Sequence, residues 1–281
     1  MMDIEFSHVT FYYKSNLALR DITCEIAEGT TLLVAGHNGS GKSTFLKLMN
    51  GILKPTEGEI TLGGESNVNK RTSELAAKCA LSFQNPDDQL FAPTVKKELH
   101  FGIGNIHADD SLIGPIATLL KLGEVMERNP YSLTYAQRRL VAIASVAVMN
   151  TPILAFDEPT AGLSIREKAY LGDLIALLRK MKKTLVVVTH DLNFLLQYAD
   201  SLLLLAHGKV EYFGGRDMFF DRKDSRQILA RCGITYPVYP RISAATNLKA
   251  HYFIAADVAD SLKKREPAPP SAQGQHQLEG A

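Results

Sequence analysis

The chain of 281 residues contains no tryptophan and only three cysteines, Cys24, Cys79 and Cys232. An odd number of widely separated cysteines provides neither a disulfide framework nor the spacing of a metal site, so the composition predicts a reduced, cytosolic protein. Long apolar runs are also missing. The two best candidates, Leu140–Met149 and Leu202–Ala206, are far shorter than the roughly 18 apolar residues that a membrane span needs. We therefore expect that the chain does not cross a bilayer.

The sequence has no excess of charge of either sign, because 31 lysines and arginines are balanced by 30 aspartates and glutamates. Nucleic-acid binding proteins need a basic surplus to contact phosphates, so we expect no nucleic-acid partner. Hydrophobic residues make up 46% and charged residues 22%, which is typical of a chain with a buried core and excludes disorder as the global state. The length predicts one large α/β domain or a compact pair of domains that share a sheet.

Strand and helix patterns alternate along the chain. Continuous β-branched strands between helices indicate a mostly parallel sheet, and the alternating N-terminal segments indicate an antiparallel β portion. The expected strands are 4–10, 19–26, 31–35, 59–62, 79–83, 153–156 and 184–189, with a hairpin at 207–208. The expected helices are 42–50, 94–101, 111–121, 133–149, 164–180 and one from residue 191.

A glycine-rich loop occurs between the expected strand 31–35 and the expected helix 42–50. Its sequence, GHNGSGKS at 36–43, fits the P-loop pattern G-x-x-x-x-G-K-[ST]. Main-chain N–H groups of such a loop point at phosphates, the lysine reaches the β- and γ-phosphates, and the serine hydroxyl ligates Mg²⁺. The sequence therefore predicts nucleotide binding at Gly36, His37, Asn38, Gly39, Ser40, Gly41, Lys42, Ser43 and Thr44.

Two further strands end in polar side chains. Asp157 and Glu158 follow strand 153–156, and ligands of parallel sheets bind at the carboxyl ends of strands, so Asp157 is expected to hold Mg²⁺ and Glu158 to orient or deprotonate a water. The alternative is a strand that ends in solvated acids. His190 follows strand 184–189, where a neutral imidazole can hydrogen-bond the γ-phosphate and the attacking water. A packed or capping histidine is the alternative.

Three other positions receive an interpretation from their surroundings. Gln84 ends strand 79–83, where its amide oxygen can ligate Mg²⁺ and release it when the loop moves, although it would otherwise be an ordinary loop residue. An aromatic ring at 11–13 could stack on an adenine, although aromatic residues in strands usually belong to the core. Arg138 and Arg139 follow an expected helix start, and we expect them at the surface.

With these motifs in order, residues 3–215 resemble the ATP-binding cassette (ABC) ATPases. The similarity is greatest to the ATPase subunits of energy-coupling-factor and cobalt/nickel-type importers. It is carried by GHNGSGKST at 36–44, LMNGILKPTEG at 48–58 and, most specifically, FQNPDDQLF at 83–91. The resemblance implies ATP and Mg²⁺ as cofactors. The roles it implies are Tyr13 for adenine, Lys42 and Ser43 for phosphate and Mg²⁺, Gln84 for the coupling loop, Asp157 for Mg²⁺, Glu158 as catalytic carboxylate and His190 as switch.

The resemblance also implies a domain organisation. We expect an ABC ATPase domain at 1–215 with a P-loop core and a helical subdomain inserted at about 86–150. A small helical appendix at 216–264, with a possible part in dimerisation, should follow. The Pro- and Gln/Gly-rich residues 265–281 are expected to be disordered.

Two segments depart from the family's pattern. The family's signature helix reads Leu-Ser-Gly-Gly-Gln, and the corresponding residues here are Leu133, Thr134, Tyr135, Ala136 and Gln137. Ser164 stands where the family has an aspartate. In the head-to-tail dimers of this family, both segments contribute to the nucleotide site of the partner. We therefore expect a heterodimer of two related ATPases with one strong and one weak site. The alternative is a homodimer in which Tyr135 rotates aside.

The function implied is ATP hydrolysis that energises a membrane importer of a micronutrient, a vitamin or a transition-metal ion. Its expected partners are a second ABC ATPase, a transmembrane coupling protein that docks near Gln84–Phe91, and a substrate-binding membrane component. The expected location is the cytoplasmic face of the cell membrane. One alternative is a soluble ABC ATPase of DNA repair or translation, although such proteins typically carry a coiled-coil insertion or a second cassette. A non-hydrolysing nucleotide-sensing scaffold is the other.

Overall fold

The computed structural model describes residues 2–106, 109–238 and 240–241. The chain divides into two compact units, residues 1–237 and 238–281. The second unit contributes only residues 238, 240 and 241 to the described part. The expected tail at 265–281 and residues 242–264 of the expected appendix lie outside the described residues. The following description concerns the first unit.

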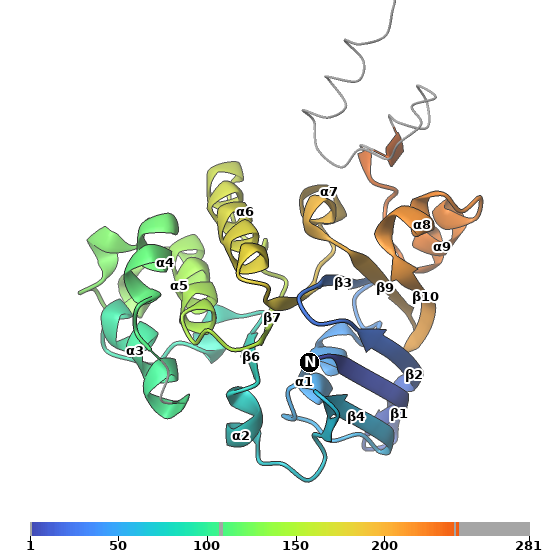
Figure 1. Ribbon diagram of the computed structural model, residues 1–281. Coiled ribbons are helices and arrows are strands. Elements are labelled where there is room, and N and C mark those ends of the chain that lie inside the picture. The colour runs from blue at the N-terminus through green and yellow to red at the C-terminus, as the bar shows by residue number, and fades with distance from the viewer. Residues whose placement is uncertain (1, 107–108, 239, 242–281) are drawn as a thin grey trace, which may run out of the picture. The chain divides into compact units, whose positions relative to one another are not determined.

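A six-stranded, mostly parallel sheet forms the centre of this unit (Figure 1). In sheet order the strands are β10 (Lys209–Gly215), β9 (Ser201–Ala206), β3 (Thr31–Gly36), β8 (Thr184–Val188), β7 (Ile153–Asp157) and β6 (Cys79–Ser82). Four of the neighbouring pairs are parallel, and only β10 pairs antiparallel to its neighbour β9. Every residue of β3, β7 and β8 is buried, as continuous apolar strands between helices predict.

A four-stranded antiparallel sheet contains the N-terminal strands β1 (Ile4–Tyr13) and β2 (Asn16–Ile26), followed by β4 (Glu57–Leu62) and β5 (Glu65–Ser66). One hydrophobic cluster joins side chains of this sheet to the parallel sheet and to α1 (Lys42–Met49). Within it, the ring of Phe6 on β1 stacks on that of Phe45 on α1, with centroids 4.2 Å apart. This packing holds the helix that follows the P-loop against both sheets.

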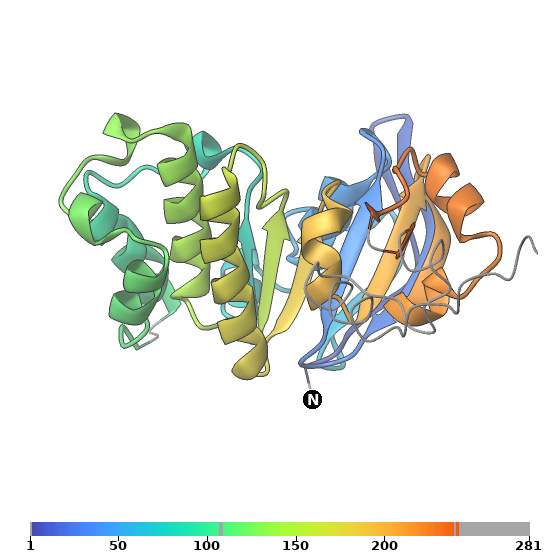
Figure 2. The ribbon, with the colours of Figure 1, turned by 90° about the horizontal axis from the view of Figure 1, so that it is seen from above.

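A helical subdomain is inserted between β6 and β7, and Figure 2 shows it grouped at the β6 side of the parallel sheet. Its main helices are α3 (Val95–Ile106), α4 (Ile113–Leu119) and α5 (Tyr135–Ala147). The short 3₁₀ turn Pro86–Asp88 precedes α3, and the turns Gly123–Val125 and Pro130–Ser132 lie between α4 and α5. Helix α3 is longer than the expected 94–101. Gly102, in the part of α3 beyond the expected end, permits close packing against Met149, because a Cβ atom at position 102 would lie 2.9 Å from Cγ of Met149.

The remaining elements complete the core and the appendix. Helix α6 (Ile165–Lys180) buries one face, α7 (Leu192–Leu195) follows β8 with the 3₁₀ turn Leu196–Tyr198, and α8 (Arg216–Phe220) and α9 (Ser225–Arg231) follow β10. Helix α2 (Thr72–Ala76) and strand β5 were not expected from the sequence, because both are too short to show a periodic pattern. Within the described ranges, the longest and most apolar helices still fall short of what a membrane crossing requires.

Replacing Phe45 with alanine should lower the free energy of unfolding by about 3–5 kcal/mol, because the substitution leaves a cavity under the P-loop helix. Urea denaturation followed by circular dichroism measures this change. Ile165 provides the control, since its side chain is 90% exposed and its replacement by alanine should stay within about 0.5 kcal/mol. Equal losses in the two variants would contradict the core assignment.

Candidate nucleotide-binding site

The P-loop connects the carboxyl end of β3 to the first turn of α1. Glycine is required at Gly36, because an added Cβ atom would lie 2.2 Å from the carbonyl oxygen of Leu205. Gly41, the N-cap of α1, has a φ of 106°, a backbone conformation that residues other than glycine rarely adopt. The structure therefore contains the predicted order of strand, loop and helix, with the start of α1 directed at the site for an anion.

Lys42 folds back over the loop that precedes it. Its Nζ atom donates to the carbonyl oxygens of Gly36, at 2.8 Å, and of His37, at 3.0 Å. Burial lowers the pKa of Lys42, and the nearby charges of Glu158 and Asp157 act in the opposite direction. The ammonium group thus lies between the loop and the carboxylates, where phosphate oxygens can replace its carbonyl partners.

Two residues of the loop, His37 and Ser40, contact the protein rather than the cleft. The ring of His37 lies against that of His207, with centroids 4.6 Å apart, and its Nε2 accepts from the main-chain N–H of His207 at 3.3 Å. Ser40 is fully buried, and its hydroxyl oxygen has no hydrogen-bond partner among the described residues. Both were expected to bind nucleotide, and that expectation remains a prediction for their main-chain groups.

The predicted carboxylates lie at the end of β7. Asp157 and Glu158 are only 7% and 6% exposed, and Glu158 has a positive φ of 50°, an uncommon conformation for this residue type. The Oε2 atom of Glu158 lies 2.8 Å from Nδ1 of His190 and accepts from its main-chain N–H at 3.4 Å. The structure therefore brings Glu158 and His190, which are 32 residues apart, into direct contact.

Asp157 is the group best suited to a cation. Burial, together with the neighbouring charge of Glu158, raises its pKa, while a hydrogen bond from Ser43 and the charges of Arg139 and Lys42 oppose the rise. Its Oδ1 atom is buried and has no hydrogen-bond partner among the described residues. An unpartnered carboxylate oxygen beside a serine hydroxyl is a donor set that Mg²⁺ prefers, so these residues fit the predicted metal.

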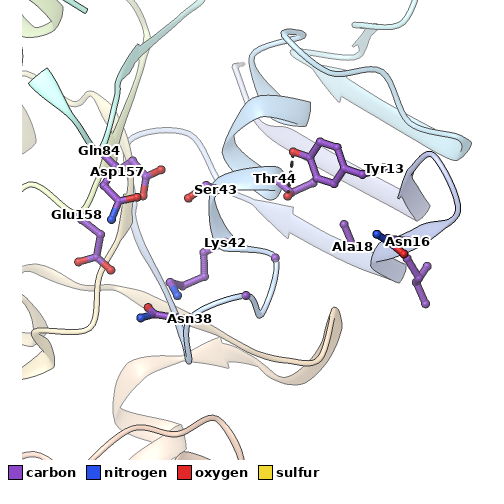
Figure 3. A pocket seen from close by; sticks show the side chains of 13 residues that line it. Tyr13, Asn16, Ala18, Asn38, Lys42, Ser43, Thr44, Gln84, Asp157 and Glu158 are labelled. Carbon is purple, nitrogen blue, oxygen red and sulfur yellow. Dashed lines mark hydrogen bonds between the residues drawn. The ribbon is translucent and has the colours of Figure 1, made fainter. Parts of the chain in front are cut away.

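One cleft of about 470 Å³, a size typical of ligand sites, is lined by six of the predicted P-loop residues and by Tyr13, Gln84, Asp157 and Glu158 (Figure 3). Gly36, His37, Ser40 and His190 are not among its lining residues. Figure 3 shows Gln84, Asp157 and Glu158 on one side and Tyr13 with Thr44 on the other. The hydroxyl groups of Tyr13 and Thr44 lie 3.4 Å apart. The lining residues are Tyr13, Asn16, Leu17, Ala18, Asn38, Gly39, Gly41, Lys42, Ser43, Thr44, Gln84, Asp157 and Glu158.

The signature segment Leu133–Gln137 contributes no residue to this cleft in the part of the chain that the structure describes. Thr134 caps α5: its hydroxyl oxygen accepts from the N–H of Gln137, whose side chain accepts from the N–H of Thr134. Tyr135 is 41% exposed, and its ring packs closely on Gly162. A Cβ atom added to Gly162 would lie 2.5 Å from Cε1 of Tyr135. Ser164 likewise caps α6, so this substitution preserves the helix start.

Arg139 is the residue that sequence reasoning missed. It is fully buried, which contradicts its expected place at the surface. Its guanidinium group donates to main-chain carbonyls of the Gln84 segment and of the end of β7. The signal was present in the helical spacing, because Ala142, Ile143 and Val146, three, four and seven residues later, form a buried face that includes Arg139.

The family model described as ABC transporter matches residues 19–161, which include the P-loop, the Gln84 segment, α5 and the end of β7. The chain belongs to the ABC transporter family of ATPases. The resemblance expected from the sequence, the α/β cassette fold and the assignment as an ABC-type ATPase that binds ATP are thereby confirmed.

Relatives of this ABC ATPase include two energy-coupling factor transporter ATP-binding proteins. It is 37% identical over 251 residues to the energy-coupling factor transporter ATP-binding protein EcfA2 of Bacillus licheniformis, covering 84% of this chain and 86% of that protein. It is 32% identical over 269 residues to EcfA1 of Mesomycoplasma hyopneumoniae, covering 93% and 97%. A solved structure, a dimeric post-hydrolysis state of the ATP-binding cassette MJ0796 bound to ADP and Pi, matches with a TM-score of 0.69 and 26% identity, covering 76% and 98%.

Replacing Asp157 of this ABC ATPase with asparagine should stabilise the nucleotide-free protein at neutral pH. Its pKa in the fold lies above the ordinary value, so ionisation destabilises the native state above that pKa, and this penalty disappears as the pH falls through it. The midpoint of urea unfolding without Mg²⁺ should therefore be higher for D157N near pH 7, and the difference should shrink in acid. D173N, at an exposed position on α6, should show no such pH-dependent gain. A lower midpoint for D157N at pH 7 would contradict the assignment.

Proposed function

We propose that this chain is the ATP-hydrolysing subunit of an energy-coupling-factor importer of a micronutrient, a vitamin or a transition-metal ion, bound peripherally at the cytoplasmic face of the cell membrane. The names of the relatives EcfA1 and EcfA2 support the type of transporter. The observation that carries the proposal is the contact between Glu158 and His190 at the edge of a cleft lined by the P-loop. A non-hydrolysing scaffold would have no need of this contact.

The proposed reaction is the in-line attack of water on the γ-phosphate of ATP. Lys42 and the N–H groups at the start of α1 stabilise the charge on the phosphates, and Tyr13 stacks on the adenine. Glu158 orients the attacking water and takes its proton. His190 fixes the Glu158 carboxylate through Nδ1 and its main-chain N–H, and its exposed ring is free to reach the γ-phosphate.

The proposed Mg²⁺ ligands of this chain are Ser43, Asp157 and Gln84. The unpartnered Oδ1 of Asp157 and the neighbouring Ser43 hydroxyl support this assignment. When bound, the cation neutralises charge on the phosphates. Gln84 lines the same cleft from the segment that leads into the helical subdomain, so a movement of that subdomain would alter its reach.

We further propose that the working form is a heterodimer with a second ABC ATPase. The cleft of this chain is open on one side, and its own signature segment does not reach it, so a partner would complete it. Tyr135, Ala136 and Ser164 of this chain would enter the partner's site. Tyr135 places a bulky ring at the start of α5, where the family's glycine permits close approach. One strong and one weak hydrolytic site are the result.

The proposed membrane contact lies on the helical subdomain. Phe91 follows the Gln84 segment, and Phe101 lies on α3; both rings are about half exposed and meet edge to face with centroids 4.5 Å apart. This exposed apolar pair, beside the segment 84–91, supports docking of a helix from the transmembrane coupling protein, which would in turn bind the substrate-binding membrane component. The appendix, of which α8 and α9 are the described part, is proposed to extend the dimer interface.

Replacing Glu158 with glutamine should lower ATP turnover of the assembled heterodimer by about 100- to 10,000-fold, because the amide cannot accept the proton of the water. ATP binding should persist, so filter binding should show retained nucleotide while phosphate release stops. Unchanged turnover would contradict the role of Glu158.

The chain purified alone should hydrolyse ATP slowly, and addition of the partner ATPase should accelerate hydrolysis at least about tenfold, because the partner supplies a signature helix with glycines. Phosphate release at matched nucleotide concentration measures this difference. The variant Tyr135→Gly gives the control, since it should raise the rate of the chain alone. Equal, fast hydrolysis with and without the partner would contradict the heterodimer.

A further inference from the structure

Arg139 connects the signature helix to both segments that carry the proposed catalytic groups. It lies on α5, two residues after the signature segment, and its side chain is fully buried. Nη1 donates to the carbonyl oxygens of Phe83, at 2.7 Å, and Gln84, and Nη2 donates to those of Asp157, at 2.7 Å, and Glu158. One side chain thus binds four carbonyls in two adjacent pairs.

The shape of the guanidinium group suits this arrangement. Its two terminal nitrogens lie in one plane and carry two N–H donors each, so each nitrogen can serve one pair of carbonyls at the same time. A lysine has its three donors on one atom and cannot span two pairs. Because the group is removed from water, its positive charge makes these hydrogen bonds stronger than neutral ones.

The backbone of Glu158 depends on this contact. Its φ of 50° is costly for a residue with a long side chain and persists only where neighbouring groups hold it. The N–H of Glu158 donates to the carbonyl oxygen of Val188 on β8, at 3.0 Å, and its carbonyl oxygen accepts from Arg139. The peptide groups on the two sides of Glu158 are therefore held from different directions, and its carboxylate is directed at His190.

The neighbouring Arg138 provides a comparison within the same helix. Its Nε atom lies 2.9 Å from Oδ1 of Asp87, in the 3₁₀ turn Pro86–Asp88, and Nη1 donates to the carbonyl oxygen of Leu133. Arg138 therefore also ties α5 to the segment after Gln84, but these contacts do not extend to β7. Of these two arginines, Arg139 alone joins that segment to the end of β7 through one group.

We propose that Arg139 is a positioning residue for hydrolysis, which sets the main chain at Gln84 and Glu158 together and makes the position of both depend on α5. The inference rests on the proposed function, because it assumes that Glu158 acts on the water. It adds a physical connection between the helix that faces the partner's nucleotide and the groups that act on the chain's own nucleotide.

The test compares the variants Arg139→Met, Arg139→Lys and Arg138→Met in the assembled heterodimer. The methionine side chain fills the same space without donors, and R138M removes the same charge from the adjacent position. Turnover, affinity for a fluorescent ATP analogue and the midpoint of thermal unfolding are measured for each. R139M should lose about 100-fold in kcat, the order expected for a catalytic group displaced by about 1 Å, with ATP affinity within about threefold of the unmodified protein. R139K should lose less, and R138M less than about threefold.

A second comparison places R139M in the E158Q background and measures the residual single-turnover rate. If Arg139 acts through Glu158, its replacement should reduce that rate by less than about threefold, because the group that it positions is already disabled. A loss as large as in the unmodified background would show that Arg139 does not act through Glu158 and would overturn the proposal.

The remaining outcomes are equally decisive. Parallel losses of kcat and ATP affinity in R139M, or an equal loss of kcat in R138M, would overturn the proposal. If R139M does not fold, the test uses R139K, which keeps the buried positive charge. An unchanged kcat in R139K would contradict the proposal, because lysine cannot donate to both pairs of carbonyls. Failure of the proposed function would be recognised separately, because the unmodified heterodimer would then hydrolyse no ATP or E158Q would remain fully active.

Discussion

Two adjacent carboxylates buried at the end of β7 are the constraint on which the site depends. Asp157 and Glu158 carry negative charge where water has little access, and such charges are costly unless cationic or hydrogen-bonding groups face them. Lys42 approaches from the P-loop, His190 from the end of β8 and Arg139 from α5. Each of these three residues comes from a different segment. Their interactions with the two carboxylates therefore bring the P-loop, the parallel sheet and the helical subdomain together in one site.

This arrangement leaves one acceptor for an incoming cation. The hydrogen bond from Ser43 and the positive charges of Arg139 and Lys42 oppose the rise in the pKa of Asp157 without reversing it. The Oδ1 atom of Asp157 has no partner among the described residues. A nucleotide that arrives with Mg²⁺ would bring positive charge to the carboxylate and phosphate oxygens to Lys42. The burial of the Asp157 carboxylate is therefore unfavourable in the nucleotide-free protein, and a bound Mg²⁺–nucleotide would offset this cost.

The two faces of the chain differ in how well they keep the family's pattern. The cleft retains its P-loop and its carboxylates, and His190 contacts Glu158, whereas the start of α5 carries Tyr135 and Ala136 in place of glycines. Neither residue has a positive φ, and Thr134 caps the helix, so the changes leave the helix start intact. Both residues lie at the helix start that the proposed partner would meet, and this is the physical basis for the two unequal sites of the proposed heterodimer.

The local pattern of the chain was sufficient to predict the order of the main elements, the P-loop and the carboxylates after β7, because each depends on neighbouring residues or on where a strand ends. Helix α2, strand β5 and the full length of α3 were not predictable, since short elements and a glycine-containing helix depend on packing that the local pattern does not contain. The surface position expected for Arg139 was wrong for a different reason, because the apolar residues three, four and seven positions later already indicated a buried face of α5 that includes it.

By itself, then, the sequence determined that a nucleotide-binding α/β cassette forms and which residues end its strands. Only the tertiary structure decided that Glu158 meets His190, that Asp157 keeps an unpartnered oxygen, and that Arg139 binds the carbonyls at 83–84 and 157–158. These contacts join segments that are tens of residues apart. Glu158 meets His190 because β7 and β8 are neighbours in the parallel sheet, and Arg139 reaches its four carbonyls because α5 packs against β6 and β7.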